Sequence, residues 1–200
     1  DHVVTDERIS TGIHELDTMM GGKGCFRGSS VLVSGMAGSG KSSVAAHFAD
    51  AACRRGESVL YFAFEESAAQ IERNMRSIGL NLRHWVDAGL LRFKAHRPSL
   101  QGLEMHLATM HKQIEDFEPT TITADPVTSL IASGVEEDVR TMLTRLVDFL
   151  KGKQITSMFT TLSHGSGALE ITQVFISSIM DAWLLVRDIE IGGERNRGLY

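Results

Sequence analysis

A phosphate-binding motif is the clearest chemical signal in this sequence. Residues 35–43 read GMAGSGKSS and fit the pattern G-x-x-x-x-G-K-[ST] in full. Glycines let the backbone turn its N–H groups toward a phosphate chain, the lysine reaches the outer phosphates, and the serine hydroxyl binds Mg²⁺. We therefore predict a nucleotide and Mg²⁺ site, whose phosphate-binding residues are Gly35, Ala37, Gly38, Ser39, Gly40, Lys41, Ser42 and Ser43.

The sequence around the motif supports this interpretation. An apolar run at 29–35 predicts a buried strand, and the spacing of apolar residues over 41–56 predicts the helix that follows it. The positive end of such a helix points at a bound phosphate. The alternative is a glycine-rich turn with an incidental lysine, which would not require a strand before it and a helix after it.

A single aspartate is the candidate second metal ligand. Asp125 ends the apolar run TTITADP, where a strand over 120–126 is expected to stop at Pro126. In phosphate-loop enzymes an Asp at the end of a buried strand helps to hold Mg²⁺. Asp-Pro is also a common turn, so the aspartate alone is ambiguous, and the phosphate loop decides in favour of the metal role.

Two adjacent carboxylates are the candidate catalytic groups, together with Lys41. Glu65 and Glu66 follow the strand expected at 57–65, and the carboxyl ends of parallel strands face the ligand crevice. A carboxylate there can orient or deprotonate a nucleophile, and Glu66 is also a candidate Mg²⁺ ligand. The alternative is that both glutamates complement the start of a helix near Ser67. The pattern does not decide which glutamate acts.

Strand and helix patterns alternate along the chain, which predicts crossover connections and a mostly parallel sheet flanked by helices. Glycines at 191–194 predict a hairpin that adds an antiparallel edge. We expect residues 1–200 to form one α/β domain. The remaining expected helices are at 67–79, 101–117 and 136–152, and the remaining expected strands at 90–96, 155–163 and 181–191.

Composition limits the function classes. The chain has 200 residues, 42% of them hydrophobic, and a net charge of −5, which argues against a general nucleic-acid binder. No apolar run approaches the roughly 20 residues of a membrane helix. The two cysteines form no metal-binding pattern, and His106 and His111 lack a third ligand. We expect a cytoplasmic protein with no membrane contact. Since the chain starts without Met, we expect a fragment of a longer chain.

The chain resembles the KaiC family of circadian-clock ATPases, which have a RecA-like fold, and within it the second, autokinase domain. The resemblance runs almost from end to end and rests on motifs in the same order and spacing. The matching stretches are RISTGIHELDTMMGG, GMAGSGKS, FAFEESAAQIERN, ITADPVTSL, FTTLS, FISSIMD and IEIGGERNR.

This resemblance implies ATP and Mg²⁺ as cofactors and a hexameric ring with ATP between neighbouring copies. It implies that Glu65 and Glu66 are catalytic and that Ser177 and Ser178 accept and release phosphate, supported by Thr172. From the residues alone, a Ser-Ser pair among apolar neighbours indicates buried serines bonded to backbone, so the phosphorylation sites depend on the resemblance. The implied partners are other copies of the chain and clock proteins of the KaiB and KaiA types.

The sequence also departs from the family. Ser178 stands where the best-known members have threonine, Pro126 where they have serine, and LIASGVEED lacks an arginine that can lie near a neighbour's nucleotide. The family's basic segment that touches a neighbour's γ-phosphate, and the peptide that KaiA binds, follow the part matched here. Arg195 and Arg197 remain as candidates for contacts between subunits, or as solvated hairpin charges.

Two other functions stay open at this point. A RecA-type DNA-dependent ATPase, either a recombinase or a helicase motor, would need a basic mobile loop, yet the loop at 163–171 carries no Lys or Arg. A nucleotide-holding module without turnover would not need the paired glutamates. Nucleic acid is therefore not an expected partner.

Overall fold

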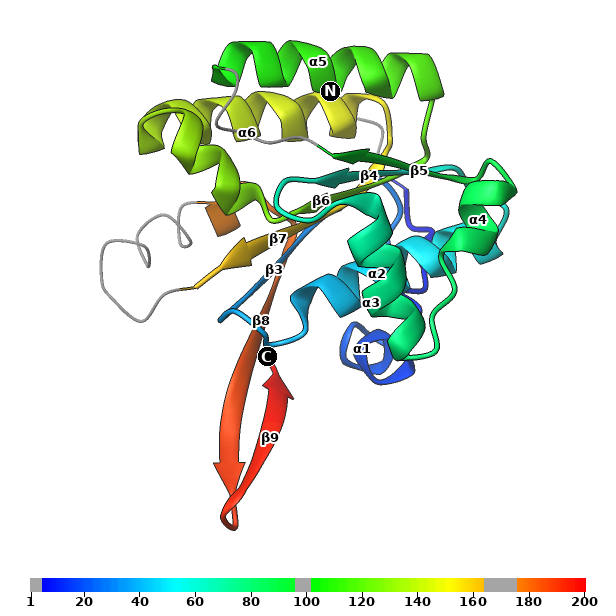
Figure 1. Cartoon of the computed structure of the whole chain (residues 1–200), viewed down its shortest axis with the longest axis vertical. Coiled ribbons are helices and arrows are strands. Elements are labelled where there is room, and N and C mark those ends of the chain that lie inside the picture. The colour runs from blue at the N-terminus through cyan, green and yellow to red at the C-terminus, as the bar shows by residue number, and fades with distance from the viewer. Residues whose placement is uncertain (1–4, 96–101, 164–175) are drawn as a thin grey trace.

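The computed structural model describes residues 5–95, 102–163 and 176–200 (Figure 1). The strands are β1 (Arg8–Ile9), β2 (Cys25–Phe26), β3 (Ser30–Gly35), β4 (Val59–Ala63), β5 (Leu91–Ala95), β6 (Thr121–Asp125), β7 (Thr156–Leu162), β8 (Ala182–Ile191) and β9 (Glu194–Leu199). The helices are α1 (His14–Met19), α2 (Lys41–Arg54), α3 (Ala68–Ser77), α4 (Arg83–Asp87), α5 (Leu103–Phe117), α6 (Glu136–Gly152) and the 3₁₀ helix η2 (Val127–Ser133).

A seven-stranded sheet with the order β5-β4-β6-β7-β3-β8-β9 organises the fold. Its pairs from β5 to β8 are parallel, while β8 and β9 pair antiparallel. The predicted α/β class, with a mostly parallel sheet and an antiparallel hairpin at the edge, is therefore confirmed. Figure 1 shows the β8–β9 hairpin extending away from the rest of the molecule.

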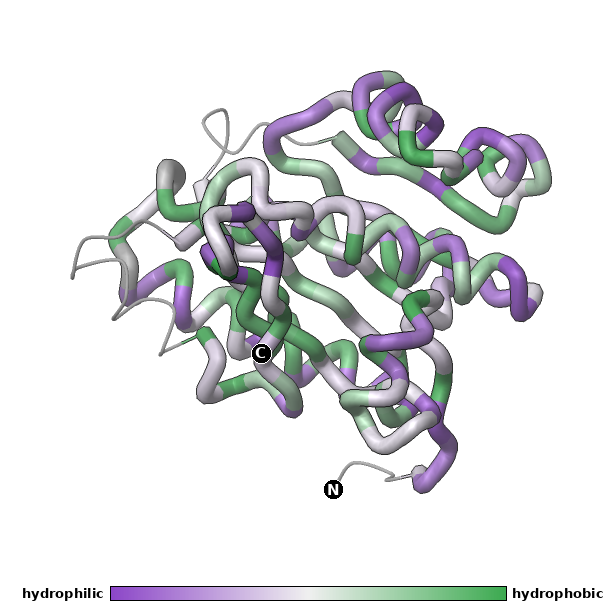
Figure 2. Tube along the Cα trace, turned by 90° about the horizontal axis from the view of Figure 1, so that it is seen from below, coloured by the Kyte–Doolittle hydropathy of each residue, from purple (hydrophilic) through white to green (hydrophobic). Residues whose placement is uncertain are grey.

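Helices cover both faces of the sheet (Figure 1). The pair α5 and α6 lies on one face, over an apolar cluster that includes Leu60, Phe62 and Phe159. Helices α1, α2 and α3 lie on the other face, over two further clusters. Figure 2 shows hydrophobic colours along the central strands and hydrophilic colours on outer helical turns, as expected when helices bury one side against a sheet.

Helix α2 contacts strands β3, β4, β6 and β7. Its buried positions are mostly small, among them Ala45, Ala46, Ala49 and Ala52, each with no exposed surface. Small side chains let the helix axis approach the sheet closely, so α2 holds its first turn firmly at the carboxyl end of β3. That first turn carries Lys41 and Ser42.

Several short elements were not predicted. The β1–β2 pair, α1, α4 and η2 have between two and seven residues each. Segments this short show too few periods of a hydrophobic pattern to be recognised, and tertiary contacts determine their structure. The segment before β3 is held, for example, by Arg27, which bonds to Glu7 and Glu57 at 2.7 and 2.9 Å.

Within the described residues, no helix combines the length and the apolar character that crossing a membrane requires.

Candidate nucleotide site

The phosphate loop connects β3 to α2, as the sequence predicts. Gly38 and Gly40 have φ angles of +75° and +101°, which side-chain-bearing residues rarely adopt. Gly35 is needed for a different reason. A Cβ atom on Gly35 would lie 2.7 Å from both the Val186 carbonyl oxygen and the Ser39 hydroxyl. Close packing against β8 therefore excludes a side chain at Gly35, and positive φ explains only the later glycines.

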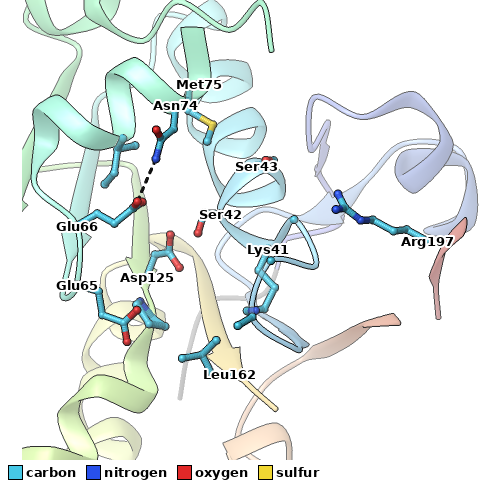
Figure 3. Close-up of a pocket in the computed structure, with 15 residues that line it drawn as sticks. Lys41, Ser42, Ser43, Glu65, Glu66, Asn74, Met75, Asp125, Leu162 and Arg197 are labelled. Atoms are coloured by element: carbon cyan, nitrogen blue, oxygen red, sulfur yellow. Dashed lines mark hydrogen bonds between the residues drawn. The ribbon is translucent and has the colours of Figure 1, made fainter. Parts of the chain in front are cut away.

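A cavity of about 370 Å³ opens beside this loop (Figure 3). It brings together nine of the predicted site residues, namely Ala37, Gly38, Gly40, Lys41, Ser42, Ser43, Glu65, Glu66 and Asp125. Gly35 and Ser39 are not in its lining. Gly35 ends β3, and Ser39 is 3% exposed with its hydroxyl unpaired among the described residues. The remaining lining residues were not predicted as cofactor ligands, and they are Ile71, Asn74, Met75, Pro126, Leu162 and Arg197.

Lys41 lies at the centre of the predicted site. Its Nζ donates a hydrogen bond of 2.7 Å to the Met36 carbonyl oxygen, within the phosphate loop. Burial lowers the pKa of Lys41, and the nearby carboxylates of Asp125 and Glu65 oppose that shift. The amine therefore lies between the loop and two acidic side chains, where an added polyphosphate would meet its positive charge.

Asp125 is held by two hydroxyl groups. It ends β6, and it accepts a 2.8 Å hydrogen bond from the Tyr61 phenol of β4 and a further bond from the Thr160 hydroxyl of β7. Burial and the adjacent Asp125 charge raise the pKa of Tyr61 well above its usual value. Sequence reasoning missed Tyr61. The sequence signal was its place on the strand that leads to Glu65. Its position two residues before Ala63, the register partner of Asp125, becomes visible only in the paired strands.

The two glutamates lie in the connection between β4 and α3. Strand β4 ends at Ala63, so alternation along the strand no longer separates the two side chains. Helix α3 is capped instead by Ser67, whose side chain forms a reciprocal capping box with Gln70. The glutamates are therefore not needed as N-caps, and both line the cavity.

Each glutamate has its own hydrogen-bond partner. Glu65 Oε1 accepts from the Ser129 hydroxyl of η2 at 2.6 Å. Glu66 Oε1 accepts from the Asn74 amide of α3 at 3.0 Å, the contact drawn in Figure 3. Burial, followed by the charges of Asp125 and Glu65, raises the pKa of Glu66. The two carboxylates thus have different surroundings, with Glu65 facing η2 and Glu66 facing α3.

Arg197 of β9 also lines the cavity. Its Nη1 lies 3.5 Å from the position that a Cβ would take on Gly40, and its side chain remains 63% exposed. A long contact of 3.9 Å joins its Nε to Asp188. From the sequence, Arg197 was either a candidate for a contact between subunits or a solvated charge. In the folded chain its side chain lies at the edge of its own phosphate loop.

Ser177 and Ser178 are outside the cavity. They belong to a helical turn just before β8, in which Met180 N donates to Ser177 O. Asp181 N, directly after this turn, donates to Ser30 O of β3. Ser30 begins β3, while the phosphate loop follows its last residue, Gly35. Five residue steps of about 3.3 Å separate Ser30 from Gly35, so the two ends of β3 lie roughly 17 Å apart. Thr172 and most of the loop at 163–171 lie outside the described residues.

The donor set is suited to Mg²⁺. The Ser42 hydroxyl and the Asp125 and Glu66 carboxylates that line this cavity are hard oxygen ligands, which Mg²⁺ prefers. Across residues 5–95, 102–163 and 176–200, no group of three or more His, Cys, Asp and Glu side chains is arranged to hold a metal ion. Mg²⁺ at this site would therefore depend on nucleotide phosphate oxygens and water in addition to these side chains.

Comparisons with known proteins agree with the geometry. The family model described as "ATPase: KaiC" matches residues 9–200. The chain is 48% identical over 201 residues to "Circadian clock protein KaiC2" from Synechocystis sp., a match covering 100% of the chain and 35% of that relative. It is 36% and 38% identical to "Circadian clock oscillator protein KaiC" from Picosynechococcus sp. and Thermostichus vulcanus, over 98% and 96% of the chain and 38% and 37% of those relatives. The chain thus spans little more than a third of these relatives' length, and it belongs to the KaiC ATPase family.

Proposed function

We propose that this domain binds Mg·ATP in the cavity, hydrolyses it, and transfers its γ-phosphoryl group to Ser177 or Ser178 of a neighbouring copy in a hexameric ring. The observation that carries the proposal is the convergence of Lys41, Glu65, Glu66 and Asp125 on one cavity beside the phosphate loop. A nucleotide-holding module would not require two glutamates at that place.

The residues of the cavity would have different roles in this reaction. The loop N–H groups and Lys41 would hold the phosphates, and Ser42, Asp125 and Glu66 would hold Mg²⁺, which would neutralise charge on the phosphate oxygens. A glutamate accepts the proton of the attacking serine hydroxyl or water. The serine oxygen bonds to the γ-phosphorus as the bond from that phosphorus to the β–γ bridging oxygen breaks, and ADP leaves.

The position of the serines favours transfer between copies. Ser177 and Ser178 lie at the amino end of the β3–β8 pair, and the phosphate loop lies at its carboxyl end. A separation of roughly 17 Å is too large for direct transfer, which requires reacting atoms about 3–3.5 Å apart. A ring in which the amino edge of one copy meets the carboxyl edge of the next would bring them together.

Two complementary variants test the proposal. One carries Lys41→Ala and keeps both serines, and the other keeps Lys41 and carries Ser177→Ala and Ser178→Ala. After incubation with Mg·ATP, mass spectrometry should find phosphate on the Lys41→Ala chain only in the mixture of the two. Phosphate that forms equally well at extreme dilution would contradict transfer between copies. ATP hydrolysis that requires single-stranded DNA would favour the recombinase or helicase alternative.

Partners and biological role follow the same proposal. Relatives that match this chain are named as circadian clock proteins. We propose that this domain acts in a timing system, with clock proteins of the KaiB and KaiA types as partners, in the cytoplasm. Co-purification of the chain with such proteins, compared before and after incubation with Mg·ATP, tests this part separately from the chemistry.

A further inference from the structure

Tyr61 has an unusual position for a tyrosine in the centre of a sheet. It is fully buried in β4, and its hydroxyl reaches Asp125 Oδ2 at 2.8 Å. On the other side, Thr160 of β7 donates to Asp125 Oδ1. Because β6 lies between β4 and β7 in the sheet, the Asp125 carboxylate receives one hydroxyl from each neighbouring strand.

The strand register explains how Tyr61 reaches this carboxylate. Ala63 is the register partner of Asp125, and Tyr61 is the partner of Thr123, so the tyrosine starts one pleat earlier on the same face. The length of the phenol side chain covers that pleat. A phenylalanine at Tyr61 would fill the same space against Phe93, whose ring centroid is 5.1 Å away, but would leave Oδ2 without this donor.

The two hydroxyls also determine what Asp125 can offer to the cavity. A carboxylate has about four lone-pair sites on its two oxygens. Tyr61 and Thr160 each occupy one, on different oxygens, so each oxygen keeps one for other partners. With only 7% of Asp125 exposed, the free lone pairs have access to the cavity and to little else.

We propose that Tyr61, together with Thr160, is a positioning residue that orients the Asp125 carboxylate toward the Mg²⁺ that accompanies the nucleotide. The inference rests on the proposed nucleotide site and adds to it a residue that the motif does not contain. Groups that hydrogen-bond to a metal-binding side chain fix its orientation, and removing such a group costs about 10- to 100-fold in metal affinity.

A purely structural role for the Tyr61 hydroxyl gives a different expectation. In that case Tyr61→Phe would lower stability through the lost hydrogen bond and leave Mg²⁺ binding unchanged. The useful measurement is therefore the gain in ADP affinity when Mg²⁺ replaces EDTA, determined by isothermal titration calorimetry. This gain reports on the metal and does not depend on turnover.

For Tyr61→Phe we expect the dissociation constant of ADP in EDTA to stay within about twofold of wild type, while the Mg²⁺-dependent gain falls about tenfold. Thr160→Val should reduce the gain similarly, and Thr160→Ser should restore it because the hydroxyl returns. The matched control is Ser157→Ala, which removes a buried 2.9 Å hydrogen bond to Ser30 near the amino ends of β7 and β3, away from the cavity. This control should keep the full gain.

Two outcomes of the calorimetry overturn the inference. If Tyr61→Phe binds ADP and keeps the full Mg²⁺-dependent gain, Tyr61 does not position Asp125, and the proposed function still stands. If the wild-type chain binds ADP with no gain from Mg²⁺, the proposed metal site and this inference both fail. Comparing the wild type with the variant therefore separates the two failures.

A second measurement needs no change at Tyr61. The sequence has two tyrosines, Tyr61 and Tyr200, so Tyr200→Phe leaves Tyr61 as the sole tyrosine. Ultraviolet resonance Raman spectroscopy reports the hydrogen bonding of a phenol. We expect the Tyr61 bands to shift when Mg²⁺ is added to the ADP complex and to stay unchanged with ADP in EDTA. Identical spectra in both conditions would overturn the inference.

Discussion

The hydroxyl of Ser129 donates a hydrogen bond of 2.6 Å to Oε1 of Glu65. This bond joins η2, the 3₁₀ helix that follows β6, to the carboxylate of Glu65, which follows the neighbouring strand β4. Two loops at the carboxyl edge of the sheet are thereby connected at the cavity.

Removing this contact should reduce catalysis more than binding. For Ser129→Ala we expect kcat for ATP hydrolysis to fall about tenfold, or about 1.4 kcal/mol, with little change in KM, because the carboxylate loses its orientation and the nucleotide keeps its contacts. Steady-state kinetics measures both constants. Ser129→Thr keeps the hydroxyl and should restore kcat. A rise in KM with kcat unchanged would show instead that Ser129 acts on nucleotide binding.

The two glutamates should not be equivalent. The charge of Glu65 is close enough to Lys41 to oppose the lowering of its pKa, while Glu66 is bonded to Asn74 on α3. We therefore expect Glu65→Gln to lower hydrolysis and phosphoryl transfer by about 10²- to 10⁴-fold, the range for general base catalysis. Glu66→Gln should lower the same two rates by roughly tenfold or less. The reverse order, measured under the same Mg·ATP saturation, would assign the base to Glu66.

Most of the sheet could be predicted because its signals are local. Apolar runs ended by Gly or Pro, followed by helical spacing, indicate successive strand–helix units, and the parallel order follows from those crossovers. The phosphate loop could be predicted because one motif contains all of its residues. Asp125 and the two glutamates could be placed at the same edge since each follows a strand, although their hydrogen-bond partners could not.

The remaining site residues depend on contacts between distant segments. Tyr61 becomes important only when β4 pairs with β6, and Ser129 only when η2 folds back toward Glu65. Arg197 reaches the phosphate loop because the hairpin pairs next to β3. None of these three residues belongs to a motif that states its role, and register between strands cannot be read from periodicity within one of them.

Helix α2 should tolerate little added volume. Ala49 has no exposed surface and packs between α2 and the sheet. Because a well-packed interface has no space for three further carbons, Ala49→Leu should lower the free energy of unfolding by about 1–3 kcal/mol. Ala69→Leu makes the same change at an exposed position of α3 and should change it by less than about 0.5 kcal/mol. Urea denaturation of both variants tests the expectation, and equal effects would contradict close packing at Ala49.

The ion pairs of Arg27 should make stability depend on pH. Arg27 bonds to Glu7 and Glu57. Its hydrogen bond lowers the pKa of Glu7. For Glu57, burial would raise the pKa, but hydrogen bonds from Arg55 and Arg27 outweigh burial and lower it. Since both folded values lie below the ordinary value of 4.5, this stabilisation is present above about pH 4.5 and is lost as the pH falls through the lower folded values.

The corresponding experiment compares melting temperatures across pH. Arg27→Gln should melt about 2–4 °C below wild type at pH 7, and the difference should shrink as the pH falls below about 4.5 and the two carboxylates become protonated. Arg83→Gln removes an exposed pair with Asp87 and a long 3.9 Å contact to Glu72, and it should change Tm little at any pH. A difference for Arg27→Gln that stays the same at every acidic pH at which the protein is folded would assign the effect to packing of the arginine stem.

Arg197 provides a prediction for the hairpin. Its guanidinium lies beside Gly40, and among the described residues the carboxylate it contacts is Asp188, at a long 3.9 Å, so a phosphate in the loop would be a better partner. We expect Arg197→Ala to raise the dissociation constant of ADP about three- to tenfold, in the range of a charge-assisted hydrogen bond at a partly exposed site. Arg187→Ala, an exposed position on β8 outside the cavity lining, is the matched control and should leave affinity unchanged. If both variants weaken binding equally, the effect comes from overall charge. If neither does, Arg197 is a solvated hairpin residue despite its place beside the loop.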